Sequence, residues 1–244
     1  KTIRILEGVT SIGAYLFFTS HAETIEISST VKTIGTLAFK NCFNLLAYQV
    51  DPNNPSFSSD SDGVLLSKSQ AIFRNYPIGK PDTSYVIPST VTTLSTYAFE
   101  YALNLKRIEI GSKVPQTINV LVFANLYNLE EITVNGNTKL TSIDGVLYKV
   151  GTTLTLIKYP SGKQDESFSI PATVTAVNAN SFDNCSHLQS INVGKDVTSI
   201  VNTAIVNCQK LKSFTVDSEN IQFKSVDDVL FTFDMTQIVK YPSG

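Results

Sequence analysis

Hydrophobic positions recur in a fixed pattern along the chain, and the clearest copy is residues 91–113, VTTLSTYAFEYALNLKRIEIGSK. Apolar residues occupy matching places in the copies that begin at Val174 and Val197. Each copy closes with a segment such as Arg107–Ile110, where apolar and polar residues alternate as in a half-buried strand. A pattern that recurs every ~20–50 residues is the signature of stacked repeats. We therefore predict that each copy is one turn, or rung, of a solenoid.

A larger unit contains these rungs. The opening valines Val31, Val114 and Val197 are equally spaced along the sequence, and Tyr76-Pro77 returns at nearly the same interval. Each unit then holds two short rungs and one longer rung, in which two β-prone runs flank the segment SKSQ. These runs predict a β-hairpin, placed where a short rung has its central segment.

The central segment of a short rung, AFEYA in the clearest copy, predicts one or two helical turns. Ala98, Phe99 and Ala102 fall on one side at helical spacing. The closing segments are expected to stack into one parallel sheet of about eight strands. Their centres are Ile25–Ile27, Tyr48–Val50, Tyr85–Ile87, Ile108–Ile110, Ile132–Val134, Phe168–Ile170, Ile191–Val193 and Phe214–Val216. The fold class predicted is an α/β repeat solenoid, rich in β-structure, with short helical turns and inserted β-hairpins.

We expect residues 1–244 to form a single solenoid domain. Its three-rung units start near positions 31, 114 and 197, after a partial unit at 1–30, and this regular return is typical of a repeat array with a period of ~83 residues. Because the pattern is already under way at the first residue and stops within a unit, we interpret the sequence as an excerpt or a processed form. Missing targeting signals therefore carry little weight.

Composition narrows the classes of function. Hydrophobic residues make up 42% of the chain and charged residues 16%, which is enough for a continuous core. The formal net charge is −2 without a basic cluster, so the sequence argues against nucleic-acid binding. No apolar run reaches the ~18 residues that a membrane-spanning helix requires, so no membrane insertion is expected in this segment.

The three cysteines, Cys42, Cys185 and Cys208, occupy the same slot of the rung. A small buried residue is the expected role of this slot, because a free cysteine behaves as a small hydrophobe. Cys185 and Cys208 lie on neighbouring rungs, so the spacing allows a disulfide. The odd count and the lack of any CxxC motif favour free thiols and argue against a zinc site.

Candidate chemistry is sparse, and no catalytic residue, cofactor or metal is predicted. His21 and His187 fall in turns before a strand, where a solvent-facing side chain is expected. The stretch Asp60–Gly63 resembles half of a calcium loop but lacks the later glutamate, which favours a simple turn before a strand.

Three tyrosines precede prolines in the long rungs, namely Tyr76, Tyr159 and Tyr241. Packing against the neighbouring rung is the favoured interpretation. Projection into solvent, where the rings would offer contacts to a sugar, is the alternative.

A binding face follows from the alternation of the strands. If the apolar residues of each strand point inward, the polar residues between them line up on the outer face of the sheet. The candidate binding residues are Thr24, Glu26, Gln49, Arg107, Glu109, Glu131, Thr133, Ser190, Asn192, Ser213 and Thr215.

The repeat resembles the BspA-type, or Treponema pallidum-type, leucine-rich repeat of surface antigens from anaerobic and gut bacteria and parasitic protists. The segments Ile87–Ile110 and Ile170–Val193 carry the resemblance, and Asp144–Pro160 is similar to a variant rung of that family. The resemblance implies a right-handed leucine-rich-repeat superhelix.

The resemblance also implies a non-enzymatic protein, secreted or on the cell surface, that mediates adhesion or protein–protein interaction. Host or extracellular-matrix proteins are the expected partners. A structural spacer or stalk that presents another module, and a carbohydrate-binding module, are the alternatives. The ligand and the oligomeric state stay open.

Overall fold

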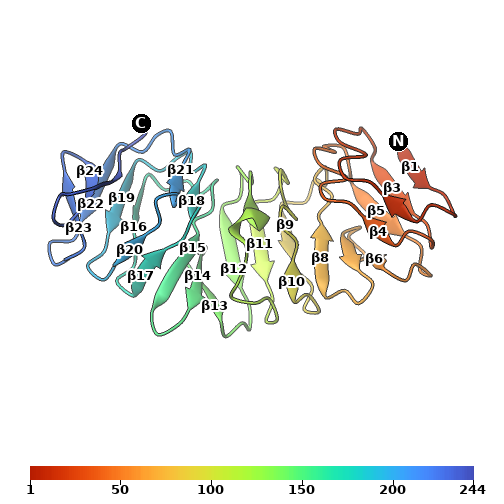
Figure 1. Ribbon diagram of the computed structural model, residues 1–244, viewed down its shortest axis with the longest axis horizontal. Helices are drawn as coiled ribbons and strands as arrows, with labels where there is room; N and C mark the ends of the chain where they lie inside the picture. The colour runs from red at the N-terminus through yellow and green to blue at the C-terminus, as the bar shows by residue number, and fades with distance from the viewer. The chain divides into compact units, whose positions relative to one another are not determined.

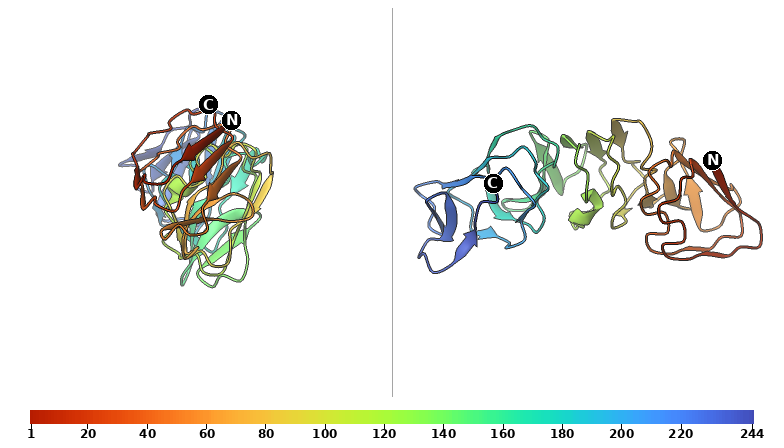
Figure 2. Two further views of the ribbon diagram at one scale, coloured as in Figure 1. Left: turned by 90° about the vertical axis from the view of Figure 1, so that its right-hand side faces the viewer. Right: turned by 90° about the horizontal axis from the view of Figure 1, so that it is seen from above.

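The computed structural model describes all residues, 1–244, as short β-strands joined by turns, with one 3-10 helix at Val120–Phe123 (η1). It divides into two compact units, one formed by Lys1–Leu105 with Lys113–Asn125 and the other by Lys106–Ser112 with Leu126–Gly244. Within each unit, successive strands lie side by side (Figure 1). The turned views show the same short strands with turns and irregular segments between them (Figure 2).

The first unit begins with three parallel strands, β1 (Thr2–Ile5), β3 (Thr24–Ile27) and β5 (Ala47–Val50). Ile25 and Tyr48 lie opposite each other in this register, and both are fully buried. The polar residues between the apolar ones stay at the surface, so the predicted alternation is confirmed here.

The second unit repeats this arrangement. The strands β11 (Arg107–Ile110) and β12 (Glu131–Val134) are parallel, and so are β16 (Ser167–Ser169), β19 (Ser190–Val193) and β22 (Ser213–Val216). With β9 (Ser84–Val86) in the first unit, every one of the expected segments forms a strand, and β1 adds one that was not predicted.

These strands form several short sheets in place of the one continuous sheet that the repeat predicts. In each long rung, the turn of a hairpin lies beside the last parallel strand of the preceding group, where the next parallel strand would otherwise be. The Tyr48 amide donates to the carbonyl of Gly63 at 2.8 Å, and the Ile132 amide donates to that of Gly145 at the same distance. Gly63 has a φ of +74°, and a Cβ there would lie 2.6 Å from the Ala47 Cβ, so only glycine fits.

The long rung carries a three-stranded antiparallel meander, where the sequence predicts only a two-stranded hairpin. The hairpin around SKSQ is confirmed as β7 (Leu65–Ser67) with β8 (Ile72–Asn75), and β6 (Phe57–Ser59) is the additional strand. Because β8 pairs in parallel with β10 (Thr93–Leu94), it is the opening strand of the long rung. The hairpin therefore precedes the central segment and does not replace it, contrary to the prediction.

The remaining strands repeat these two patterns. The later meanders are β13 (Leu140–Ile143), β14 (Val146–Val150) and β15 (Leu154–Lys158), then β23 (Phe223–Val226), β24 (Val229–Thr232) and β25 (Ile238–Lys240). The short strands of the rungs are β2 (Ser11–Ile12), β4 (Thr33–Ile34), β17 (Val174–Val177), β18 (Phe182–Asp183), β20 (Ser199–Ile200) and β21 (Ile205–Val206).

Most central segments are runs of tight turns, so the prediction of helical turns is confirmed only at η1 and is wrong for the other rungs. Ala98, Phe99 and Ala102 are buried, as their spacing predicts. Tyr97 and Tyr101, however, both have a φ of +63°, which lies outside the helical region. Turns that alternate in this way bury the same residues as a helix does, and they keep the rung flat enough to stack.

A glycine fixes the path of each long rung after its tyrosine and proline. The Gly79 amide donates to the Leu45 carbonyl at 2.8 Å, and a Cβ on Gly79 would lie 2.6 Å from the Phe43 oxygen. A Cβ on Gly162 would lie 2.5 Å from the carbonyl carbon of Asn128, and a Cβ on Gly244 would lie 2.7 Å from that of Lys210.

The tyrosines of these long rungs differ in exposure. Tyr76 and Tyr159 are fully buried, which confirms packing for both, whereas Tyr241 is 69% exposed. The idea that Tyr76 and Tyr159 contact a sugar is therefore wrong.

A buried asparagine joins the long rung to the rung before it. Asn54 donates to the carbonyls of Ser28 and Val31 at 2.7 and 2.9 Å. Its Oδ1 accepts from the amides of Ser56 and Phe57 at 2.9 and 2.8 Å. Asn220 makes the equivalent four hydrogen bonds in the second unit, and Asn137 stands at the same place in the repeat.

Candidate functional site

The outward side chains of the first strand group form a ladder. In register, Arg4 lies opposite Glu26, and Glu26 lies opposite Gln49. The Arg4 Nε contacts the Glu26 carboxylate at 2.8 Å. Thr24 is in the same strand as Glu26, so three predicted site residues, Thr24, Glu26 and Gln49, lie together here.

A charged ladder lies on β11 and β12 in the second unit. Arg107 is opposite Glu131 and Glu109 is opposite Thr133. The Arg107 Nε lies 2.6 Å from a Glu131 carboxylate oxygen, and Glu109 accepts a hydrogen bond from Asn135 at 3.1 Å. The structure brings these four predicted site residues together.

The third ladder is neutral. Ser167, Ser190 and Ser213 lie opposite one another, and Ser169, Asn192 and Thr215 do the same one step along the strands. The apolar residues between them, such as Ile191 and Phe214, are buried. The predicted site residues Ser190, Asn192, Ser213 and Thr215 therefore share one surface.

A cavity of about 330 Å³ in the first unit was not predicted from the sequence. Central segments of two rungs line it, through residues 34–41 of one and residues 95–97 with Glu100 of the other. The long rung between them contributes Arg74, Asn75 and Ile78 together with the meander residues Phe57 and Leu65. It forms because the central segment of the long rung, between β8 and β9, is shorter than the central segments of its two neighbours. The only sign of this cavity in the sequence is that Lys40 and Glu100, which hold equivalent positions in two rungs, carry opposite charges.

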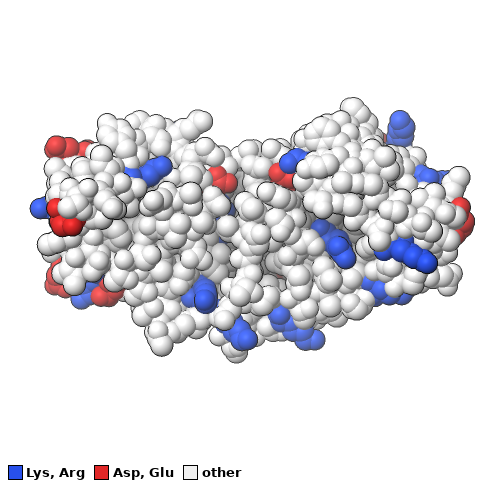
Figure 3. Space-filling model, viewed as in Figure 1, with Lys and Arg blue, Asp and Glu red and all other residues white.

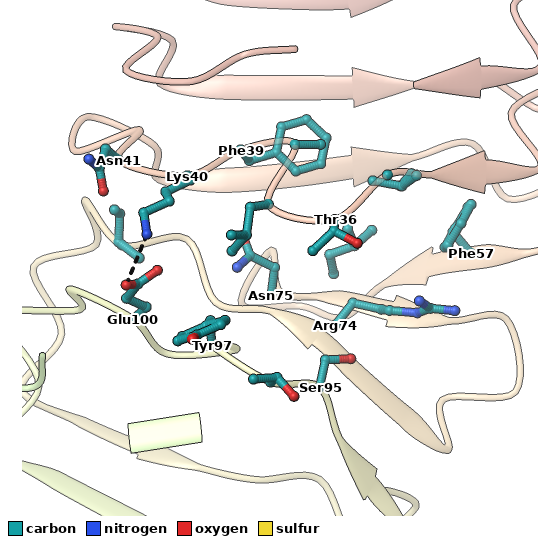
Figure 4. Close-up of a pocket in the computed structure, with 17 residues that line it drawn as sticks. Thr36, Phe39, Lys40, Asn41, Phe57, Arg74, Asn75, Ser95, Tyr97 and Glu100 are labelled. Atoms are coloured by element: carbon teal, nitrogen blue, oxygen red, sulfur yellow. Dashed lines mark hydrogen bonds and ion pairs between the residues drawn. The ribbon is translucent and has the colours of Figure 1, made fainter. Parts of the chain in front are cut away.

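Charge in this cavity is divided between two ends (Figure 4). At one end the Lys40 amine and the Glu100 carboxylate are 3.2 Å apart, and Lys40 lies over the Tyr97 ring. At the other end the Arg74 guanidinium lies 5.6 Å from the centre of the Phe57 ring. Asn75, beside Arg74, accepts a hydrogen bond from the buried Tyr48 hydroxyl through its Oδ1.

A buried lysine occupies the matching position of the second unit. Lys158 lies one three-rung repeat after Asn75 in the sequence and is 1% exposed. Its amine donates to the Asp183 carbonyl at 3.2 Å. Burial lowers the pKa of Lys158, although the neighbouring Cys185 and Asp183 act in the opposite direction.

The remaining candidate chemistry is structural. Cys42, Cys185 and Cys208 are buried and free, which confirms the role predicted for their slot. Burial raises the pKa of the Cys42 and Cys185 thiols. Asp60 accepts from the amides of Asp62 and Val64 at 3.0 and 2.8 Å, so this stretch is the predicted turn before a strand. His21 is exposed and His187 is half-buried.

The surface carries few charges for its size. On the face seen in Figure 3, lysine and arginine side chains lie singly or in small groups among uncharged surface. The structure contains no helix with both the length and the apolar character needed to cross a bilayer.

Solved structures with a similar fold are bacterial leucine-rich-repeat proteins. A leucine-rich cell surface protein from Faecalibacterium prausnitzii is 25% identical, with a TM-score of 0.53 over 91% of this chain and 70% of that one. A leucine-rich repeat protein from Eubacterium ventriosum is 21% identical, with a TM-score of 0.53 over 88% of this chain and 54% of that one. The pneumococcal vaccine antigen PcpA is 21% identical, with a TM-score of 0.56 over 90% of this chain and 58% of that one.

No curated protein matches the chain closely enough to count as a relative. The sequence pattern of the BspA type leucine rich repeat region matches in six copies, over residues 1–61, 78–167 and 161–243. These ranges cover nearly the whole chain, including the three ladders and most of the cavity lining. The chain belongs to the BspA-type leucine-rich-repeat family.

Proposed function

We propose that this chain is a non-enzymatic leucine-rich-repeat protein of the cell surface or the secreted fraction, and that it binds other proteins through its polar ladders. Adhesion to host or extracellular-matrix proteins is the activity that we propose. Membership of the BspA-type family supports a role in protein–protein contact. The likeness to a leucine-rich cell surface protein supports the location.

The observation that carries this proposal is the registered alignment of polar side chains on the strands. Arg107 and Glu131 lie opposite each other, as do Asn192 and Thr215, above fully buried apolar residues. Strand spacing holds such side chains ~4.8 Å apart. Because the backbone is already fixed by hydrogen bonds, little conformational freedom is lost when a partner binds.

The charges on the ladders suit a polar protein surface of mixed charge. The group Arg107, Glu109 and Glu131 combines one guanidinium with two carboxylates, and the serine-rich ladder is neutral. Charged pairs at the rim of an interface contribute chiefly to specificity and to the rate of association.

A charge-swap variant tests this proposal. Exchanging the pair as R107E/E131R keeps the net charge and the ion pair while it reverses the pattern of charge on the ladder. The matched control is K195E/E219K, which exchanges another exposed ion pair, at 3.2 Å, in residues that follow β19 and β22. Both variants should keep their stability within ~1 kcal/mol, because exposed ion pairs contribute little.

Binding is measured by biolayer interferometry against immobilised matrix proteins and host-cell extracts. We expect the wild type and K195E/E219K to bind with similar association rates, and R107E/E131R to bind at least ~10-fold more slowly. Equal binding by both variants would place the contact elsewhere. No binding of the wild type to any matrix protein or extract would favour the spacer alternative.

A further inference from the structure

The cavity in the first unit carries more unpaired polar groups than a structural gap requires. Asn41 lines it, and the Asn41 Oδ1 is buried without a hydrogen-bond partner. A buried acceptor in this state costs free energy unless a donor reaches it. The Asn75 Oδ1 is occupied by the Tyr48 hydroxyl, and this leaves its amide nitrogen as a donor at the cavity wall.

The charges of the lining favour a small anion. Its charged side chains are Lys40, Arg74 and Glu100, which sum to one positive charge. Lys40 and Glu100 neutralise each other at 3.2 Å. The Arg74 guanidinium lies against the Phe57 ring and is paired with no carboxylate of the protein. Arginine binds a carboxylate through two parallel hydrogen bonds, so this end of the cavity suits a carboxylate.

The rest of the lining suits a hydroxylated ring. Thr36, Ser95 and Thr96 bring hydroxyl groups, and Ile34, Leu37 and Tyr97 bring apolar surface to the same cavity. A sugar ring presents hydroxyls at its edge and C–H groups on its faces, so it matches both kinds of surface. The volume of about 330 Å³ falls within the ~300–1,000 Å³ of small-molecule sites.

We infer that the cavity binds an acidic sugar at the end lined by Arg74, Asn75 and Thr36, with its carboxylate on Arg74. The site belongs to the first unit alone. At the matching positions of the second unit, one three-rung repeat later in the sequence, Ile157 and Lys158 are both buried, and neither offers a cation to a ligand. The site is independent of the ladders and of the protein partner that we propose for them.

Ligand titration followed by amide chemical shifts tests this inference on the full chain. The probes are D-glucuronate, D-glucose, which lacks the carboxylate, and lactate, which lacks the ring. We expect saturable shifts at residues 34–36, 74–75 and 95–96 with glucuronate, and affinities at least ~10-fold weaker for glucose and lactate. Equal binding of glucose, equal binding of lactate, or no binding of glucuronate would each overturn the assignment.

Two variants locate the contact. Arg74→Gln removes the charge of an exposed side chain and should weaken glucuronate binding at least ~10-fold while leaving glucose binding unchanged. Lys32→Gln is the matched control, because it removes an exposed cation of the same unit outside the cavity. Thr36→Val should weaken both sugars to a similar extent. An unchanged affinity of Arg74→Gln for glucuronate would show that the carboxylate does not bind there.

Discussion

At the scale of single residues, Lys158 is the charged side chain that the fold holds most deeply. It is 1% exposed, and its single hydrogen bond goes to the Asp183 carbonyl. A lysine amine removed from water favours its neutral form, and burial accordingly lowers its pKa. Replacing it with an apolar side chain of similar length removes this desolvation cost.

We therefore expect Lys158→Met to be more stable than the wild type at neutral pH. In the wild type, the unfolded chain binds more protons than the folded chain between the lowered pKa and the ordinary value of 10.5, so stability rises with pH in that window. Urea unfolding of both proteins, followed as the pH is raised toward 10.5, should show the difference between their free energies of unfolding narrowing. A gap that is constant or widens with pH would contradict this account.

Alternation along the strands was sufficient to predict whether most single residues are buried or exposed, but it was not sufficient for the residues of the long rung. Ile108 and Glu109 take the inner and outer positions that their spacing predicts. Lys158 was not recognised as buried because Asn75 and Lys240 hold the same position, and a polar residue at the end of a strand is ordinarily exposed. Arg74 and Asn75 were missed for the same reason, since the cavity depends on where the rung turns.

At the scale of elements, the buried asparagines hold the meanders against the rung before them. Asn54 is 0% exposed, and its four hydrogen bonds go to two carbonyls of the turn after β3 and to two amides at the start of β6. A buried backbone group without a partner costs ~1–3 kcal/mol. The neighbouring Asn53 is exposed, so the same substitution there removes a side chain without these contacts.

We expect Asn54→Ala to lower the free energy of unfolding by ~2–4 kcal/mol, through several backbone groups left unpaired. Asn53→Ala is the matched control and should change it by less than ~0.5 kcal/mol. The two values come from urea denaturation followed by circular dichroism. If both variants lose the same amount, the hydrogen bonds of Asn54 do not fasten the meander.

The repeat predicted where elements lie better than it predicted their conformation. Helical spacing and a run of alternating turns bury the same residues, so Ala98 and Phe99 alone do not distinguish them. The φ of +63° at Tyr97 and Tyr101 decides for turns, and tyrosine carries no local signal for that conformation. The asparagine column did leave a signal, because Asn54, Asn137 and Asn220 recur at the same constant interval as the opening valines.

At the scale of the whole molecule, we propose that residues 1–244 unfold as one solenoid, as the unbroken repeat predicts. In a stacked array each rung is stabilised by its neighbours, so unfolding spreads along the chain. The two compact units exchange segments along the sequence, because Lys106–Ser112 belongs to the second unit and Lys113–Asn125 to the first. The chain therefore has no single linker at which it could be divided into these two units.

The cysteines report on each unit separately. Cys42 lies in the first unit, and Cys185 and Cys208 lie in the second; all three are at most 1% exposed. A thiol reagent should label none of them in the native protein, because all three thiols are buried out of its reach, and burial also raises the pKa of Cys42 and Cys185. Mass spectrometry of labelled peptides across a urea series should place Cys42 and the Cys185–Cys208 pair at one midpoint. Labelling of Cys42 at a lower urea concentration than the pair would show that the first unit unfolds on its own, and the single-solenoid prediction would then be wrong.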